Sequence, residues 1–546
     1  MRYIILCLFL SVLISDIQAQ DPPVKWDQVR NPRTDQPATA GRLWFTRDMG
    51  RSPWGAFYLT GYSGRADTAR LLRTYSSNAN PGLSVPIYAP VGDTLDFVWG
   101  TSLAFSQTDV FVSGLFKGAI EFDENNIFVS QDEGRDAFLA SYSPGGFMRW
   151  AVSLGDNFEE KLPVIGITED DRLSLALRTA DTLFRPIEIR TFDRLGNKLD
   201  SVKINHSPEV DDILFDKKGN LFLAGKINAP SRIGGNLILP NGIEDFYLTK
   251  YRADGSMSWL THAGTGGEAA ATAIEVGDDG RLYFAAQFGL NAPAGDTLTL
   301  FDSTYYTTRG SDILVGALDT SGQLLWSQHI HRGLGGFSTG MRITDITIND
   351  QDVYMAGSFM DGPTIIGDTT IQTSGFDPVV LAFSTKGVFH WATRFGTAND
   401  DEGLRIANIR PKEIFVTGVL NNLKDTLDAS FGDIVFPVST KFDPFLATLH
   451  DLYIPPVTSI ETDIPGDWNL FPNPANDRIY LRWSGTMEPV RKLSLSDVQG
   501  RTLFSQKVQP SLAGQEAINL HELAPGFYFL KVQVGSRFWV KSFQKL

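Results

Sequence analysis

The sequence has almost no cysteine. Of its 546 residues only Cys7 is a cysteine, and it lies within an apolar run at the start of the chain. The rest of the chain therefore cannot form disulfide bonds, thiolate metal sites or cysteine nucleophiles.

Positive charge is also scarce. The chain has 48 Lys and Arg against 63 Asp and Glu, which gives a formal net charge of -15. Binding to phosphate backbones needs clustered Lys and Arg, and the sequence holds no basic patch. We therefore expect no nucleic acid among the partners, and acidity of this size also disfavours anionic lipid surfaces.

Long apolar runs are missing after the first segment. "MRYIILCLFLSVLISDIQAQ" combines Arg2, an apolar run too short to span a bilayer, and the small residue Ala19. These features are typical of a cleaved signal peptide, which we assign to residues 1–19. Cys7 does not end a lipobox-like sequence, so no lipid anchor is expected on it, and no transmembrane segment is expected later in the chain.

Glycine, proline and aromatic residues are abundant. The chain has 51 Gly, 28 Pro and 12% aromatic residues, with only 20% charged residues. This balance favours many short strands joined by tight turns and predicts an all-β fold.

A hairpin with tryptophan recurs along the chain. "YRADGSMSWLTHAG" at 251 has a Gly four residues before Trp259, and the same spacing precedes Trp150, Trp326 and Trp391. Each hairpin follows an apolar strand such as "LFLAG" at 221 and a strand that opens with Asp, and a further apolar strand comes after the Trp. Copies of the apolar strand make seven repeats of four strands, the pattern of a β-propeller rather than a solenoid.

The ends of the repeat region predict how it closes. The last copy, from 414, shows only its first two strands, whereas Trp26 and "GRLWFTRD" at 41 supply strands before the first full copy. We therefore predict a seven-bladed β-propeller over residues 21–451, closed two-plus-two by N- and C-terminal strands, which removes the open edge.

The recurring tryptophans are predicted to pack between blades, with each preceding Gly in a turn of positive φ. The blade-packing residues are Trp26, Trp150, Trp259, Trp326 and Trp391.

This run of apolar strand, Asp-led strand and "DGSMSWLTHAG" resembles the beta-propeller repeat (SBBP-type) found in secreted bacterial proteins. The resemblance covers about residues 21–450 and is clear in about five copies. It fails in the third, where Asp200 replaces the Trp, and this departure predicts an irregular blade. The family describes a scaffold and implies no particular reaction.

The chain changes character after residue 451. Residues 452–462 bear prolines without periodicity and are assigned as a linker. Residues 463–546 alternate like the strands of a small Ig-like β-sandwich and have ten Lys or Arg against seven Asp or Glu, unlike the acidic repeats.

This tail resembles the C-terminal sorting domain (type A) of the type IX secretion system. The matching sorting-signal residues are Pro472, Asn473, Pro474, Asp497, Gly500, Leu523, Pro525, Gly526, Lys541 and Lys545. The resemblance implies export to the cell surface or the medium, the type IX machinery as partner, and removal of the tail. The alternative is a generic Ig-like module of an adhesin.

Three patterns invite a reading as catalytic or metal sites. Ser338 in "GFSTG" matches a nucleophile motif but lies in a turn between strands instead of a strand-to-helix turn. His329 and His331 share one strand face without a visible third zinc ligand. The acidic turns do not follow a calcium loop. We therefore expect no catalytic residues, no metal and no cofactor.

Asp-Thr pairs recur and resemble the O-glycosylation sites of bacteria with this secretion system. The threonines are Thr94, Thr182, Thr297, Thr369 and Thr426. Descent from a common repeat explains the recurrence equally well.

These observations predict a secreted or cell-surface propeller that binds a polysaccharide or a protein and has no catalysis of its own. The alternative is an extracellular enzyme, glycan-active or hydrolytic, with its site at the channel mouth. Carboxylates or histidines from several blades with shifted pKa values would favour the enzyme.

Overall fold

The computed structural model describes most of the chain. The described residues are 22–31, 44–63, 68–88, 97–130, 134–155, 163–178, 186–293, 295–308, 310–332, 340–349, 351–360, 362–373, 376–397, 401–421, 428–438, 442–453, 467–485, 488–497, 502–521, 523–534 and 537–545. They form strands and turns without a helix, so the all-β prediction is confirmed. A search of these residues for an apolar helix of membrane-spanning length finds none. The predicted signal peptide and most of the predicted linker lie outside the described residues.

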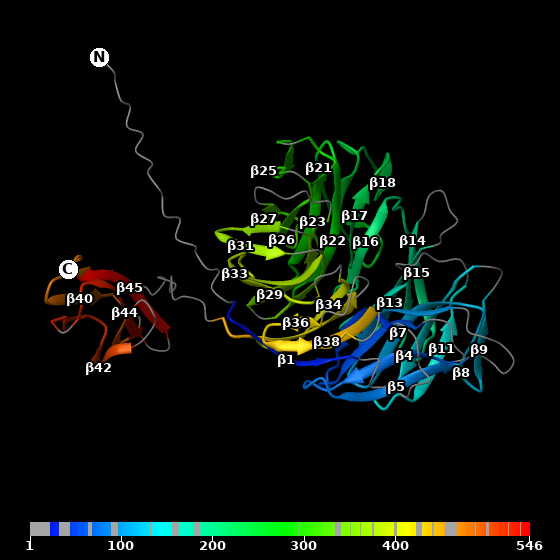
Figure 1. The fold of residues 1–546 in the computed structure, drawn as a ribbon, viewed down its shortest axis with the longest axis horizontal. Coiled ribbons are helices and arrows are strands. Elements are labelled where there is room, and N and C mark those ends of the chain that lie inside the picture. Colours follow the sequence, from blue (N-terminus) through cyan, green and yellow to red (C-terminus); the bar gives the residue numbers. More distant parts are fainter. Residues whose placement is uncertain are drawn as a thin grey trace, which may run out of the picture. The chain divides into compact units, whose positions relative to one another are not determined.

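The chain divides into two compact units, residues 1–453 and 454–546. The first unit is built from antiparallel quartets of strands (Figure 1). The first strands of the quartets are β2 (Trp44–Arg51), β6 (Phe97–Phe105), β12 (Val164–Ile167), β16 (Glu209–Phe215), β22 (Glu268–Val276), β28 (Arg342–Ile348) and β34 (Glu402–Arg410). The second strands are β3 (Phe57–Ser63), β7 (Val110–Lys117), β13 (Leu173–Arg178), β17 (Leu221–Ile227), β23 (Leu282–Leu290), β29 (Asp352–Phe359) and β35 (Glu413–Asn421).

The outer half of each quartet follows the same order. The third strands are β4 (Thr68–Tyr75), β10 (Asp136–Tyr142), β14 (Ile187–Phe192), β20 (Asp245–Tyr251), β26 (Asp312–Leu318), β32 (Asp377–Ser384) and β38 (Phe442–Asp451). The fourth strands are β5 (Pro81–Tyr88), β11 (Met148–Ser153), β15 (Lys198–Ile204), β21 (Met257–Gly264), β27 (Leu324–Arg332), β33 (Phe389–Arg394) and β1 (Val24–Arg30).

Several quartets carry a short hairpin between their second and third strands. These hairpins are β8 (Ala119–Asp123) with β9 (Asn126–Val129), β18 (Ser231–Ile233) with β19 (Asn236–Ile238), β24 (Thr297–Leu300) with β25 (Ser303–Tyr306), β30 (Gly362–Ile366) with β31 (Thr369–Thr373), and β36 (Ala429–Phe431) with β37 (Ile434–Phe436).

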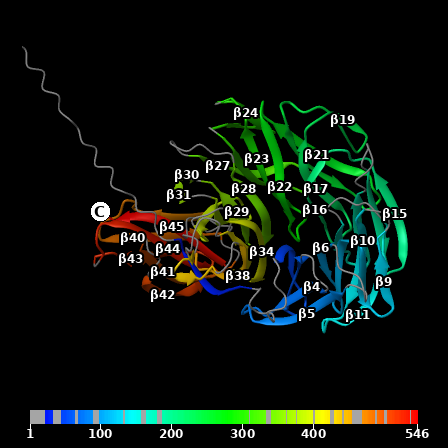
Figure 2. The same cartoon turned by 45° about the vertical axis from the view of Figure 1, so that its right-hand side comes forward.

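The first strands lie side by side at the middle of the unit. Contacts join them in the order β2, β6, β12, β16, β22, β28, β34 and back to β2. Figure 2 shows β6, β16, β22, β28 and β34 inside this unit, with outer strands such as β5, β15 and β24 along its edge. The quartets therefore radiate from a shared centre.

The N-terminal strand lies in the same sheet as the last repeat. β1 pairs with β38, with Trp26 opposite Leu449, and β38 pairs with β35. The sheet thus joins three C-terminal strands to one N-terminal strand, so the predicted two-plus-two division is wrong. The reason is that the apolar strand after each Trp pairs with the next repeat, as β22 does with β23, and the strand from Trp44 likewise belongs to the first quartet.

The repeated tryptophans lie on fourth strands, and Trp150, Trp259 and Trp326 contact the turn of the following quartet. A Cβ atom at Gly322 would lie 2.7 Å from the Trp259 ring, and one at Gly387 would lie 2.5 Å from the Trp326 ring. Both glycines have φ of +85°, which other residues rarely adopt. The glycine four residues before one Trp thus makes room for the Trp of the preceding quartet.

The quartet without a tryptophan is regular. β12, β13, β14 and β15 form a four-stranded sheet, and Asp200 occupies the Trp position opposite Thr191. Its turn still receives the preceding ring, since a Cβ atom at Gly196 would lie 2.8 Å from Trp150. The expected irregularity is therefore wrong, because the turn glycine and the ladder persist without this quartet's own Trp.

The second unit consists of two antiparallel sheets. One contains β39 (Asp467–Phe471), β40 (Arg478–Ser484) and β43 (Gly514–Asn519), and the other contains β41 (Val490–Asp497), β42 (Thr502–Ser511), β44 (Gly526–Val534) and β45 (Arg537–Lys545). Buried residues of both sheets, including Leu481, Trp483 and Leu530, form one hydrophobic cluster. This is the arrangement of a small β-sandwich.

Candidate functional site

A cavity of about 550 Å³ lies among the first strands of the quartets. We call it the central cavity. Its lining includes the carboxylates Asp48, Asp212, Glu275 and Asp345, each from a different first strand, together with Arg405. Because these residues converge from distant parts of the sequence, the central cavity is the first candidate site.

A β-bulge recurs in the first strands and positions the aspartates. The register shifts between Thr46 and Asp48, between Val210 and Asp212, and between Ile343 and Asp345. A bulge adds one residue to its strand and re-aims the side chain beside it.

Three of the carboxylates link neighbouring first strands. Asp48 Oδ2 accepts a hydrogen bond from the Leu103 amide at 2.7 Å, Asp212 Oδ2 from the Ile274 amide at 2.8 Å, and Asp345 Oδ2 from the Ile406 amide at 2.8 Å. In each case the other carboxylate oxygen accepts the amide of the next residue on its own strand. These aspartates therefore satisfy backbone amides across the gap between two quartets.

Arg405 joins three first strands through their carbonyl groups. Its Nε donates to the Arg47 carbonyl of β2 at 2.7 Å, and its Nη1 donates to the carbonyls of Thr344 on β28, at 2.9 Å, and Leu404, at 3.0 Å. The guanidinium of the last quartet thus ties the quartets on either side of it.

Glu275 is held differently. The amide that hydrogen-bonds to its carboxylate belongs to Val276, the next residue of its own strand. Burial, and then the charges of Asp345, Asp212 and Asp48, raise the pKa of Glu275 well above its usual range. Burial and the neighbouring negative charges therefore both favour the protonated form of this carboxyl group.

Burial also raises the pKa values of the aspartates. It raises the pKa of Asp212 to about 6 and that of Asp345 to about 7, against the opposing effects of Arg405 and the backbone amides. The pKa of Asp48 is raised for the same reason. Carboxylates from several quartets with raised pKa values favour an enzyme. Three of these carboxylates, however, already accept hydrogen bonds from backbone amides.

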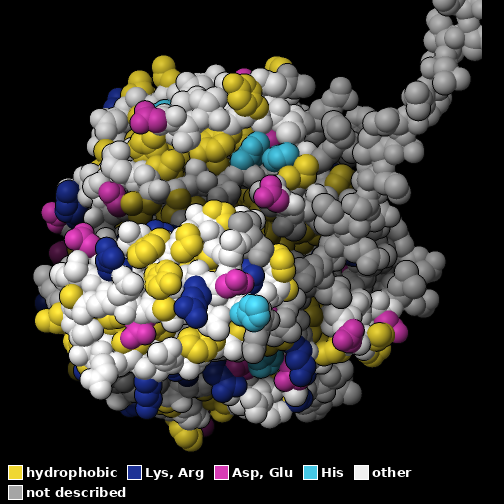
Figure 3. Space-filling model, turned by 90° about the vertical axis from the view of Figure 1, so that its left-hand side faces the viewer, with side chains coloured by type: hydrophobic (Ala, Val, Ile, Leu, Met, Phe, Trp, Pro, Cys, Tyr) yellow, Lys and Arg dark blue, Asp and Glu magenta, His cyan; other side chains and the backbone are white. Residues whose placement is uncertain are grey.

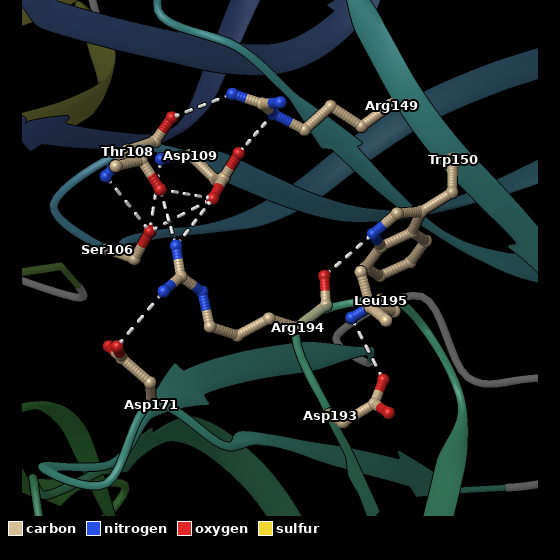
Figure 4. A network of polar contacts seen from close by, with 9 residues as sticks. All are labelled: Ser106, Thr108, Asp109, Arg149, Trp150, Asp171, Asp193, Arg194 and Leu195. Atoms are coloured by element: carbon tan, nitrogen blue, oxygen red, sulfur yellow. Dashed lines mark hydrogen bonds and ion pairs between the residues drawn. The ribbon is translucent and has the colours of Figure 1, made fainter.

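A second polar network joins two quartets at the edge of the unit (Figure 4). The Arg194 guanidinium lies 2.9 Å from Asp109 Oδ2 and 3.3 Å from Asp171 Oδ2, and Arg149 pairs with the other Asp109 oxygen. Burial alone would raise the pKa of Asp109, but hydrogen bonds from Thr108 and Arg194 and both guanidinium charges lower it overall. This network links two neighbouring quartets, and both oxygens of the Asp109 carboxylate are paired with arginine side chains.

The predicted histidine pair lies on β27. The ring centres of His329 and His331 are 5.1 Å apart, and His329 Nε2 lies 3.1 Å from Asp312 Oδ2. Among the described ranges, no group of three or more His, Cys, Asp or Glu side chains is placed to hold a metal ion. Ser338 lies outside the described residues.

The candidate glycosylation sites are split. Thr297 is exposed on β24 and Thr369 is half-buried on β31, both on the short hairpins. Thr94, Thr182 and Thr426 lie outside the described residues.

The residues of the predicted sorting signal lie near both ends of the second unit. Pro472, Asn473 and Pro474 are exposed, and Asn473 Oδ1 accepts a hydrogen bond from the Gln544 amide of β45 at 3.0 Å.

The remaining residues of that signal lie at strand ends or outside the described ranges. Asp497 ends β41, Pro525 and Gly526 stand at the start of β44, and Lys541 is exposed on β45. Gly500 lies outside the described residues.

Sequence reasoning missed the residues of the central cavity. Their signal is a recurring Asp followed by Ile or Met in the first strands, as in "RDMG" at 47, "DDIL" at 211 and "TDIT" at 344. The pattern indicates a repeated role, but the amide that each aspartate binds lies about 55 to 62 residues further along the chain.

Comparisons with known proteins identify the tail. Residues 469–545 match the family described as Secretion system C-terminal sorting domain. The sequence matches none of the curated proteins.

Solved structures give distant likenesses. A protein of unknown function from Bacteroides caccae is 11% identical with a TM-score of 0.26 and covers 50% of this chain and 92% of its own. The polysaccharide lyase Uly1 is 10% identical with a TM-score of 0.39, covering 75% and 90%. A puromycin hydrolase is 11% identical with a TM-score of 0.38, covering 72% and 55%. At these TM-scores the likenesses carry no argument about function.

Proposed function

We propose that this protein is exported by the type IX secretion system and acts at the cell surface or in the medium as a seven-bladed β-propeller that binds a polysaccharide or another protein. The sorting tail supports the export step and a contact with the export machinery. The cyclic contacts of the first strands support the seven blades, and the Trp-bearing hairpins support the resemblance to SBBP-type repeats.

The proposal that the protein has no catalysis of its own is supported by the hydrogen bonds of the cavity aspartates. Asp48, Asp212 and Asp345 each accept two backbone amides, so these carboxylates stabilise the centre of the scaffold. General acid and base catalysis needs a carboxyl group within reach of a substrate proton. In the view of Figure 3, Lys and Arg side chains lie among Asp and Glu side chains.

A second candidate function is an extracellular enzyme that acts at the central cavity. Glu275 favours it, because its carboxyl group lines the cavity and its raised pKa favours the protonated form that a general acid requires. In this alternative Glu275 donates a proton to a leaving group.

One experiment separates the two functions. The secreted protein is screened for binding to an array of glycans and extracellular polymers, and each bound compound is incubated with the protein and analysed by mass spectrometry. The proposal predicts bound compounds that stay intact. Products that the wild-type protein forms and the Glu275→Gln variant does not form would contradict the binding proposal and support the enzyme.

A further inference from the structure

Lys250 departs from the pattern of the repeats. It lies on the third strand of its quartet, directly opposite Trp259. The residues opposite Trp150, Trp326 and Trp391 are Ser141, Ala317 and Ala382, and Leu449 lies opposite Trp26. A long cationic side chain therefore stands where three other copies have a small residue. Burying part of an ammonium group costs free energy, so packing alone does not explain this lysine.

The Lys250 side chain is largely buried. It is 13% exposed, and its ammonium lies 4.8 Å from the centre of the Phe222 ring and 3.8 Å from Asp216 Oδ2. The last distance is beyond hydrogen-bond length. The Asp216 oxygens instead accept the amides of Lys218 and Asn220 and the Asn220 side chain. Among the described residues no acceptor takes a hydrogen bond from this ammonium, so its N–H donors are available to a ligand.

Lys250 lines a second cavity, of about 630 Å³, which we call the rim cavity. Lys217, Lys218 and Arg252 also line it, from the turns that follow β16 and β20. Burial first, opposed by Asp216, and then the charges of Lys218 and Arg252 lower the pKa of Lys250. The cations therefore stand close enough to repel one another, and an anion between them would relieve that repulsion.

Carboxylates also line the rim cavity. Asp278 and Asp279 line it from the turn between β22 and β23, where Asp278 Oδ1 pairs with Lys217 Nζ at 2.6 Å and Asp279 Oδ2 pairs with Arg281 Nε at 3.2 Å; each carboxylate keeps a second oxygen. Exposed carboxylates accept hydrogen bonds from hydroxyl groups. The rim cavity thus combines cations with carboxylate oxygens that can accept hydrogen bonds from hydroxyl groups, and its size suits a small ligand.

We propose that the rim cavity binds an acidic sugar residue, with Lys250 and Lys218 holding the carboxylate and with Asp278 and Asp279 accepting the sugar hydroxyls. This inference rests on the proposed binding function and names the class of ligand, a uronic-acid polysaccharide.

The test measures binding of uronic-acid oligosaccharides by calorimetry, with neutral hexose oligosaccharides of equal length in parallel. The full-length secreted protein is compared with Lys250→Met, which keeps the side-chain length and removes the charge. Lys386→Met is the matched control, because Lys386 is exposed in the turn between β32 and β33 of another quartet. We expect the uronic-acid ligand to bind, at least tenfold weaker binding by Lys250→Met, and no change for Lys386→Met.

Lys218→Ala guards against a folding defect, since Lys218 is exposed in a turn and its loss leaves the sheet intact. We expect several-fold weaker binding from this variant at an unchanged unfolding temperature. Equal affinity for neutral and acidic ligands, or no effect of Lys250→Met, would overturn the rim cavity as the site. Retained binding of any other polymer or protein in the same screen would leave the proposed function standing.

Discussion

Replacing Arg405 with methionine should weaken the centre of the first unit. Arg405 donates hydrogen bonds to the carbonyls of Arg47 and Thr344, which lie on the two neighbouring first strands. A hydrogen bond that involves a charged group contributes about 1.5–3 kcal/mol. Loss of both should therefore lower the free energy of unfolding by about 3–6 kcal/mol.

The loss should also grow with pH. Arg405 lowers the pKa values of Asp48, Asp212 and Asp345, so its removal raises them further in the folded protein. A carboxyl group whose folded pKa lies above its unfolded value adds stability at low pH, and this is lost as the pH rises through the folded pKa. The variant should thus fall further below the wild type at pH 8 than at pH 5.

The assay is urea unfolding followed by tryptophan fluorescence at both pH values. Arg342→Met is the matched control, because Arg342 lines the same cavity but is exposed. Unfolding of Arg405→Met at the wild-type urea concentration, or an equal loss from Arg342→Met, would refute the reasoning.

Three further variants test other parts of the account. Asp451→Ala should cost about 2–4 kcal/mol in urea unfolding, because the buried Asp451 accepts hydrogen bonds from a tryptophan, a tyrosine and a backbone amide. Gly387→Ala should cost about 1–3 kcal/mol more than Gly367→Ala, since both have positive φ but only the first would place its Cβ against a Trp ring; equal losses would contradict this. Glu275→Gln should be more stable than the wild type at pH 8 and equal to it at pH 4, because the raised pKa of Glu275 makes its contribution fall as pH rises; parallel pH profiles would exclude that raised pKa.

The repeats can be predicted from the sequence because the patterns that mark their strands and turns are local. The spacing from Gly255 to Trp259 marks a hairpin, and alternation along "LFLAG" at 221 marks a buried strand. The structure confirms both predictions: "LFLAG" lies in β17, and Trp259 lies in β21. The assignment of strands to sheets needs pairing information that local patterns lack. The sequence therefore assigns the strand after each Trp to the same repeat as that Trp, whereas in the structure it pairs with the next repeat.

The residues of the two candidate sites cannot be predicted from local sequence patterns. From the local sequence, Asp345 is compatible with a strand or a turn. Its role in linking two first strands depends on the hydrogen bond from the Ile406 amide, 61 residues further along the chain. Lys250 lies opposite Trp259, whereas three other copies have a small residue opposite the Trp. Both roles depend on contacts with other strands or turns, since Lys250 lies near Phe222 and Asp216 as well as opposite Trp259.

The most direct test of the scaffold asks whether the N-terminal strand completes the last sheet. Lys25 and His450 are directly opposed on β1 and β38, and Cys7 is the one native cysteine, within the predicted signal peptide. A Lys25→Cys and His450→Cys double variant of the secreted protein is oxidised, digested and analysed by mass spectrometry. The account predicts a peptide linked by this disulfide in nearly all of the folded protein. Two free thiols in folded protein would contradict it.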